Sequence, residues 1–238
     1  MRNSIWIFCL LVTAMCGQAI GQSAQDVIRR AAEALGGEDR ILSLRTLKIE
    51  GYGQAAAQNG GANASASVNS PQVWTNIQGY EKTIDLVNNR VRVRQRSQAF
   101  TSAATLSRGL GNIVTTQVLD GDIAYTVSED GEARRGGNAP NLRIELLTHP
   151  VALVRRALDP TTVVNNLRNR DNQQLVDITT EEGDSFTLGI DRETQLPTTV
   201  RWMVSDGMLA DLAFETAFTG YMPIDGVQMP FGFNTVIN

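Results

Sequence analysis

Apolar and polar residues alternate along most of this chain from about residue 46 onward, and this period of two is the feature that most constrains its fold. In one candidate strand, Phe186, Leu188 and Ile190 are separated by Thr187 and Gly189. Side chains of a β-strand point alternately to the two faces of a sheet. The pattern therefore predicts strands with one apolar face and one solvated face.

Turn signals separate the candidate strands. Asp-Gly pairs at 120–121, 130–131, 206–207 and 225–226, together with Glu182-Gly183, supply the positive φ angles of tight hairpin turns. The candidate strands are 46–54, 73–86, 89–98, 113–119, 122–128, 174–181, 184–191, 197–205, 208–221 and 227–237. Because short turns join antiparallel neighbours, the series predicts a meander, in which the small and polar residues 54–70 form a loop.

Two segments have helical periodicity instead. Residues 23–35 begin with Ser23, a suitable N-cap, and are followed by Gly36-Gly37, which favours a helix end. A second helix is expected at 141–158, with a cap and an early proline at Thr148-His149-Pro150 in its middle. We therefore expect a mainly β (α+β) protein, a curved antiparallel half-barrel whose concave apolar face is covered by helices.

The N-terminal segment has the layout of a secretory signal peptide. An apolar run at 5–15 follows Arg2, is too short to span a bilayer, and precedes a small-x-small cleavage site that ends at Gly21. We expect cleavage there. Residues 22–238 then form a single domain that is exported, to the periplasm of a bacterial cell, and has no transmembrane segment.

Both cysteines, Cys9 and Cys16, lie within this segment. The alternative to a cleaved signal peptide is a lipid-anchored form through Cys16, although Met15 is bulky for the preceding position. If cleavage follows Gly21, the mature chain has no disulfide, and its stability must come from a hydrophobic core.

Four arginines at alternate positions of residues 90–96 could mark a binding site for an anion. However, Val91 and Val93 would join the apolar face, so we expect the arginines on the opposite, solvated face. Acidic residues that could pair with them are Glu81, Asp85 and Glu215. An anionic ligand remains the alternative. Nucleic acid is not expected, because 21 basic residues are outnumbered by 25 acidic residues.

The sequence singles out no catalytic residue, metal ligand or cofactor. Its one histidine, His149, stands beside a proline where a capping role is common, and no G-x-S-x-G elbow accompanies it. With one histidine and no mature cysteine, zinc sites built from several such ligands are not expected. No carboxylate pair of the glycosidase type stands out. We interpret the chain as non-catalytic.

The apolar face offers the one candidate site. Five aromatic side chains are expected to point toward it: Trp74, Tyr80, Trp202, Phe214 and Phe218. Aromatic residues on a concave sheet can line a cavity for acyl chains, or they can form an ordinary closed core. The sequence leaves both interpretations open.

Three stretches resemble exported bacterial proteins with a lipoprotein-carrier fold. "AAEALGGEDRILSLRTLKIEGYG" (31–53) has that fold's helix, double glycine and first strand. "LGIDRETQLPTTVRW" (188–202) is similar to its recurrent hairpin, and "FTGYMPIDGVQMPFGF" (218–233) to its last strand-turn-strand unit. The resemblance implies a half-closed antiparallel barrel plugged by helices, as in the LolA and LolB carriers of outer-membrane lipoproteins.

A related resemblance suggests a different function. "RRGG" (134–137) and "LTHPVALVRRALDP" (147–160) are similar to the region that precedes the catalytic domain of some exported metallo-β-lactamase-fold hydrolases. The zinc-binding H-x-H-x-D-H motif of those enzymes does not occur in this sequence, so no catalytic residue is carried over. We expect a carrier-type module for an apolar, lipid-like ligand, with an envelope protein as a further candidate partner; the alternative is the accessory domain of such a hydrolase.

Overall fold

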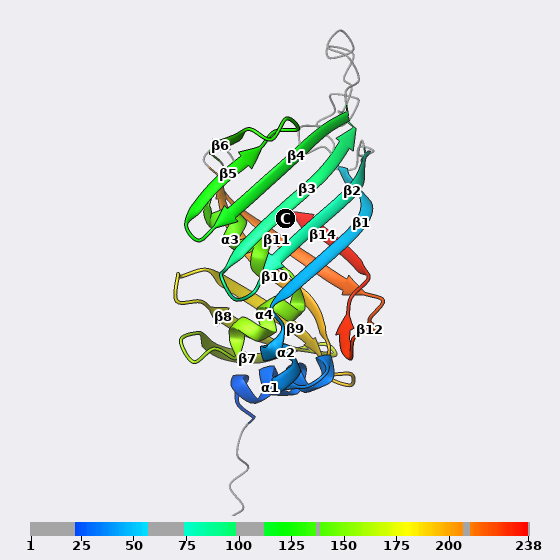
Figure 1. Ribbon diagram of the computed structural model, residues 1–238. Coiled ribbons are helices and arrows are strands. Elements are labelled where there is room, and N and C mark those ends of the chain that lie inside the picture. Colours follow the sequence, from blue (N-terminus) through cyan, green and yellow to red (C-terminus); the bar gives the residue numbers. More distant parts are fainter. Residues whose placement is uncertain (1–21, 57–73, 99–111, 137–138, 207–209, 238) are drawn as a thin grey trace, which may run out of the picture.

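The computed structural model describes residues 22–56, 74–98, 112–136, 139–206 and 210–237 (Figure 1). The predicted signal peptide, the Cys16 alternative and most of the predicted loop at 54–70 lie outside these residues. No helix in the described part is long and apolar enough to cross a membrane.

The protein is mainly β, as the period of two predicts. Its first sheet has the order β1-β2-β3-β4-β5-β6, with strands at Thr46–Ala56, Trp74–Asp85, Arg90–Gln98, Asn112–Asp120, Ile123–Val127 and Ala133–Arg135. Its second sheet has the order β14-β11-β10-β9-β8-β7. The strands of this sheet are β7 (Val163–Arg170), β8 (Gln173–Thr179), β9 (Ser185–Asp191), β10 (Pro197–Asp206), β11 (Ala210–Thr219) and β14 (Gly232–Ile237). Both sheets are antiparallel and neither is closed into a barrel.

A short hairpin of β12 (Met222–Ile224) and β13 (Val227–Met229) interrupts the second sheet between β11 and β14. The strands of the second sheet run across those of the first (Figure 1). The sequence pattern predicted the antiparallel pairing, but not the division into two six-stranded sheets and the separate two-stranded hairpin.

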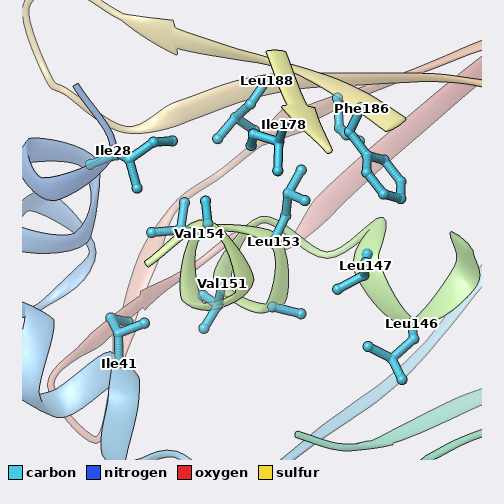
Figure 2. Close-up of a cluster of buried hydrophobic side chains, with 14 of the residues drawn as sticks. Ile28, Ile41, Leu146, Leu147, Val151, Leu153, Val154, Ile178, Phe186 and Leu188 are labelled. Carbon is cyan, nitrogen blue, oxygen red and sulfur yellow. The ribbon is translucent and has the colours of Figure 1, made fainter. Parts of the chain in front are cut away.

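In the described part of the chain, four helices fill the space beside the sheets: α1 (Ala24–Leu35), α2 (Glu38–Ser43), α3 (Ala139–Leu147) and α4 (Pro150–Ala157). Helix α3 packs on β3, β4 and β5, whereas α1 packs on β7, β8 and β13, and α4 contacts the other three helices. Figure 2 shows Leu153 of α4 directed toward Ile178 of β8. Buried hydrophobic residues from both sheets and from all four helices form one cluster.

The turn between α1 and α2 joins the N-terminal helices to the β12–β13 hairpin. Ser23 and Asp26 form a capping box at the start of α1, and Gly36, with a φ of 132°, ends that helix. Arg40 of α2 donates a hydrogen bond from Nη1 to the carbonyl oxygen of Asp225, at 2.8 Å, in the β12–β13 turn. The hairpin is thereby held against the α1–α2 turn.

Several local features differ from the sequence-based expectations, including the short strand β6, which was not predicted. The helix expected at 141–158 is two helices, because His149 caps α4 and ends the helical run of α3. The strand expected at 227–237 is divided near Pro230, which has no N–H to donate to a sheet. Strand β7 was not predicted, because its residues are mostly polar and its pairing is shifted near Asn166, whose φ is 51°.

The arginine stripe lies on the solvated face of the first sheet, as predicted. Val91 is 1% exposed, whereas the side chain of Arg92 is 51% exposed and lies 3.6 Å from Glu81. Arg90 pairs with Asp120 at 2.6 Å. The expected role of Glu215 is wrong, because it belongs to the second sheet and pairs there with Arg201. Such exposed pairs contribute little to stability.

Candidate functional site

One row of cross-strand neighbours runs over five strands of the second sheet, on the face turned toward the core. It consists of Ile178, Phe186, Trp202, Phe214 and Ile237, each opposite the next in register. Exposure rises along this cross-strand row, from 0% for Ile178 and 8% for Trp202 to 41% for Ile237 at the sheet edge. The same apolar surface is therefore core at one end and accessible to solvent at the other.

The structure brings three of the five predicted site residues onto this inner face. The rings of Trp202 and Phe214 are stacked, with centroids 5.4 Å apart and an interplanar angle of 9°. Phe218 is buried and meets Phe233 edge to face at 5.8 Å, with Phe233 itself 44% exposed. The inner face therefore presents aromatic rings between the closed core and solvent, namely those of Trp202, Phe214, Phe218 and Phe233.

Trp74 does not belong to this surface, and its expected position is wrong. Glu81 of β2 pairs with Arg94, but Gln78 pairs with Arg96, so three steps on β2 match two steps on β3. This β-bulge contains Gly79, whose φ is 56°. An extra residue reverses which side chains face inward, and Trp74 consequently lies on the outer face with 59% exposure.

Tyr80 follows Gly79 within the bulge, keeps the predicted phase with Lys82, and is half-buried on the inner face of the first sheet. Burial raises the pKa of its phenol, and the nearby carboxylate of Glu145 adds to that increase. Tyr80 therefore stands next to a polar cluster that the sequence analysis did not identify.

That cluster is centred on Lys82, which is only 4% exposed. Its ammonium group donates to the carboxylate of Glu145 at 2.8 Å and to the hydroxyl of Thr148 at 3.1 Å. The Glu145 side chain is 45% exposed, so the pair lies at the boundary between core and solvent. A signal was present in the sequence, because Lys82 occupies an otherwise apolar phase of its strand.

His149 connects this polar cluster to the second sheet. Its Nδ1 accepts a hydrogen bond from the N–H of Val151 at 3.3 Å, which caps α4, and its ring lies 5.9 Å from that of Phe233. The side chain is buried. Burial, reinforced by the positive charge of Lys82, lowers the pKa of His149 to about 3. It is therefore neutral at pH 7, with a structural role as predicted from its place beside Pro150.

The depressed pKa of His149 gives a testable pH dependence. The unfolded chain takes up a proton on His149 below about pH 6.5, whereas the folded protein does not until the pH approaches 3. Stability is therefore complete above pH 6.5 and falls as the pH decreases. We expect urea unfolding to give a free energy about 2 kcal/mol lower at pH 5 than at pH 7.

The control for this effect is His149→Asn. Asparagine keeps an acceptor for the helix cap but does not titrate. The variant should be less stable than the wild type at pH 7, yet lose well under half as much stability on going to pH 5. An equal loss in both proteins would show that another group is responsible.

The arrangement is suited to binding an amphipathic molecule. It offers an apolar aromatic surface that reaches solvent at the edge of the second sheet, and a charged pair on β2 and α3 with an exposed carboxylate. Within the described ranges, no group of three or more His, Cys, Asp or Glu side chains is placed to hold a metal ion. No protein-family model matches this sequence, and no curated protein does so either.

Proposed function

We propose that the protein is an exported, non-catalytic binding module of the carrier type, with an amphipathic, lipid-like molecule as its ligand. In this proposal the two sheets and their helices correspond to the half-barrel of LolA-like carriers. The sequence resemblance at 31–53, 188–202 and 218–233 supports that correspondence, as does the apolar run at 5–15 for export.

The observation that carries the proposal is the increase in exposure along the cross-strand row. A closed core would bury the row from end to end. Here Phe214 is half-buried and Ile237 is 41% exposed, although both continue the surface formed by Trp202. An alkyl chain that covered these side chains would gain about 0.8 kcal/mol for each methylene group removed from water, before the cost of ordering it.

The polar cluster supports an amphipathic rather than a purely apolar ligand. His149 and Phe233 are in contact, so the cluster at Lys82 and Glu145 adjoins the accessible part of the second sheet. Lys82 holds one carboxylate oxygen, Oε2, of Glu145. A hydroxyl-bearing or amide-bearing head group could donate to the exposed carboxylate while the tail lies on the aromatic side chains.

The test is binding of a fluorescent long-chain fatty alcohol, followed by its emission and by quenching of tryptophan. We expect a dissociation constant in the micromolar range. Ile237→Ser should weaken binding by roughly five- to tenfold, because it removes part of the accessible apolar surface. The side chain is already 41% exposed, so the fold should tolerate the change.

Val236→Ser is the matched control. Val236 is the preceding residue of the same strand, has a similar exposure of 44%, and points to the opposite face. Its replacement should leave the affinity within about twofold of the wild type. If neither substitution changes binding, or if the fatty alcohol does not bind at all, the inner face is not the site proposed.

A further inference from the structure

The two sheets have four edge strands among the residues that the structure describes, and three of them carry features that discourage pairing with another chain. Strand β1 has the exposed charges Lys48 and Glu50 and a register shift at Gly51. Strand β6 is three residues long and contains Arg134, whose side chain is 79% exposed. Charges, bulges and short length are the usual means of protecting an edge.

Strand β7 is protected in the same way. It carries Arg168 and Arg170, and its pairing with β8 is irregular between Asn165 and Arg168. These features leave no long, flat and uncharged stretch on which a second strand could align. Of the described edges, three therefore present charge or irregularity to solvent.

Strand β14 differs from the other three. Its sequence, GFNTVI, contains no charge and no proline, and its register with β11 is regular from Gly232 to Ile237. Apolar side chains are exposed on both of its faces, with Phe233 and Ile237 on one and Val236 on the other. The nearest carboxylate on the neighbouring strand, Glu215, is already paired with Arg201. This edge has no built-in obstacle to strand addition.

We propose that β14 pairs with β14 of a second copy of the chain, antiparallel and centred on Thr235. In a symmetric antiparallel pair, each residue must lie opposite a residue with the same outward hydrogen-bonding pattern. One residue therefore pairs with its own copy, and the two-fold axis passes midway between these two copies. Centring on Thr235 places Phe233 opposite Ile237 of the other copy, and Asn234 opposite Val236.

This register is favoured by the side chains that it matches. Phe233 and Ile237 are exposed to nearly the same degree, 44% and 41%, and an aromatic-aliphatic pair would cover both. No like charges meet across the axis, because Gly232–Ile237 is uncharged. In the dimer, the cross-strand row of each subunit would continue from Ile237 to Phe233 and Phe218 of the other subunit. The dimer does not depend on the proposed function.

Disulfide trapping tests both the dimer and its register. Single cysteines are introduced into the full chain, with Cys9 and Cys16 replaced by Ser. In Thr235→Cys the two Cα atoms would lie about 5 Å apart, within the range of a disulfide. In the control, Asn234→Cys, the two cysteines are offset along the strands and should not join. We expect mild oxidation to give a covalent dimer of Thr235→Cys alone.

Sedimentation provides the second measurement. The wild type should show concentration-dependent dimerisation, which Thr235→Lys should weaken by at least roughly tenfold, because it places two ammonium groups opposite each other. Met203→Lys adds the same charge to a residue that is 60% exposed on the outer face, and should dimerise normally. A wild type that stays monomeric, or trapping at Asn234 instead of Thr235, would overturn the proposal. Fatty-alcohol binding by a monomer would leave the proposed function intact.

Discussion

Replacing Trp202 with alanine should lower the free energy of unfolding by about 3–5 kcal/mol. The side chain is 8% exposed, stacks on Phe214, and lies opposite Phe186 on the neighbouring strand. Truncation removes the transfer energy of the indole and leaves a cavity between these rings, which the rigid sheet cannot close. Urea unfolding monitored by circular dichroism at constant pH would measure the loss.

Trp74→Ala is the matched control, because it deletes the same group from a side chain that is 59% exposed. We expect it to change the free energy of unfolding by less than about 1 kcal/mol. The contrast would measure the consequence of the β-bulge at Gly79, which puts the two tryptophans in different environments. Similar losses from both substitutions would mean that Trp74 is buried and that its placement here is wrong.

Much of the fold could be predicted from the sequence because its strands bury one face only. Alternation then indicates each strand, and Asp-Gly or Glu-Gly pairs indicate several of the turns. The observed strands Ser185–Asp191 and Pro197–Asp206 therefore agree with the expected ranges within one residue. The helix expected at 23–35 also formed, because its cap and its terminal glycine are local signals. Strand β7 could not be predicted, because a mostly polar edge strand has no alternation to detect.

The candidate site was only partly predictable for a related reason. Alternation assigns faces correctly only while the register is unbroken, and one additional residue at Gly79 was enough to reverse the position of Trp74. The burial of Lys82 depends on Glu145 and Thr148, which are more than 60 residues away in the sequence. Pairing between distant segments leaves no periodic trace, so tertiary contacts were needed to show this cluster.

The α1–α2 turn supplies the second large effect. Gly36→Ala should lower the free energy of unfolding by about 3 kcal/mol, for two separate reasons. A φ of 132° is costly for any residue with a Cβ atom, by roughly 1–2 kcal/mol. That atom would also overlap the carbonyl oxygen of Gly226 and lie 3.2 Å from the Cα atom of Val227, which adds roughly 1–3 kcal/mol.

Gly37→Ala separates the two contributions. Gly37 also has a positive φ, 104°, but the nearest atom to an added Cβ is a carboxylate oxygen of Glu33 at 4.0 Å. This variant should lose only the conformational part, about 1–2 kcal/mol, in the same unfolding measurement. The difference between the variants then reports how tightly the β12–β13 turn is packed against α1. If Gly36→Ala is no more destabilising than Gly37→Ala, the hairpin can move away from the helix, and the contact between Gly36 and Gly226 does not hold the hairpin in place.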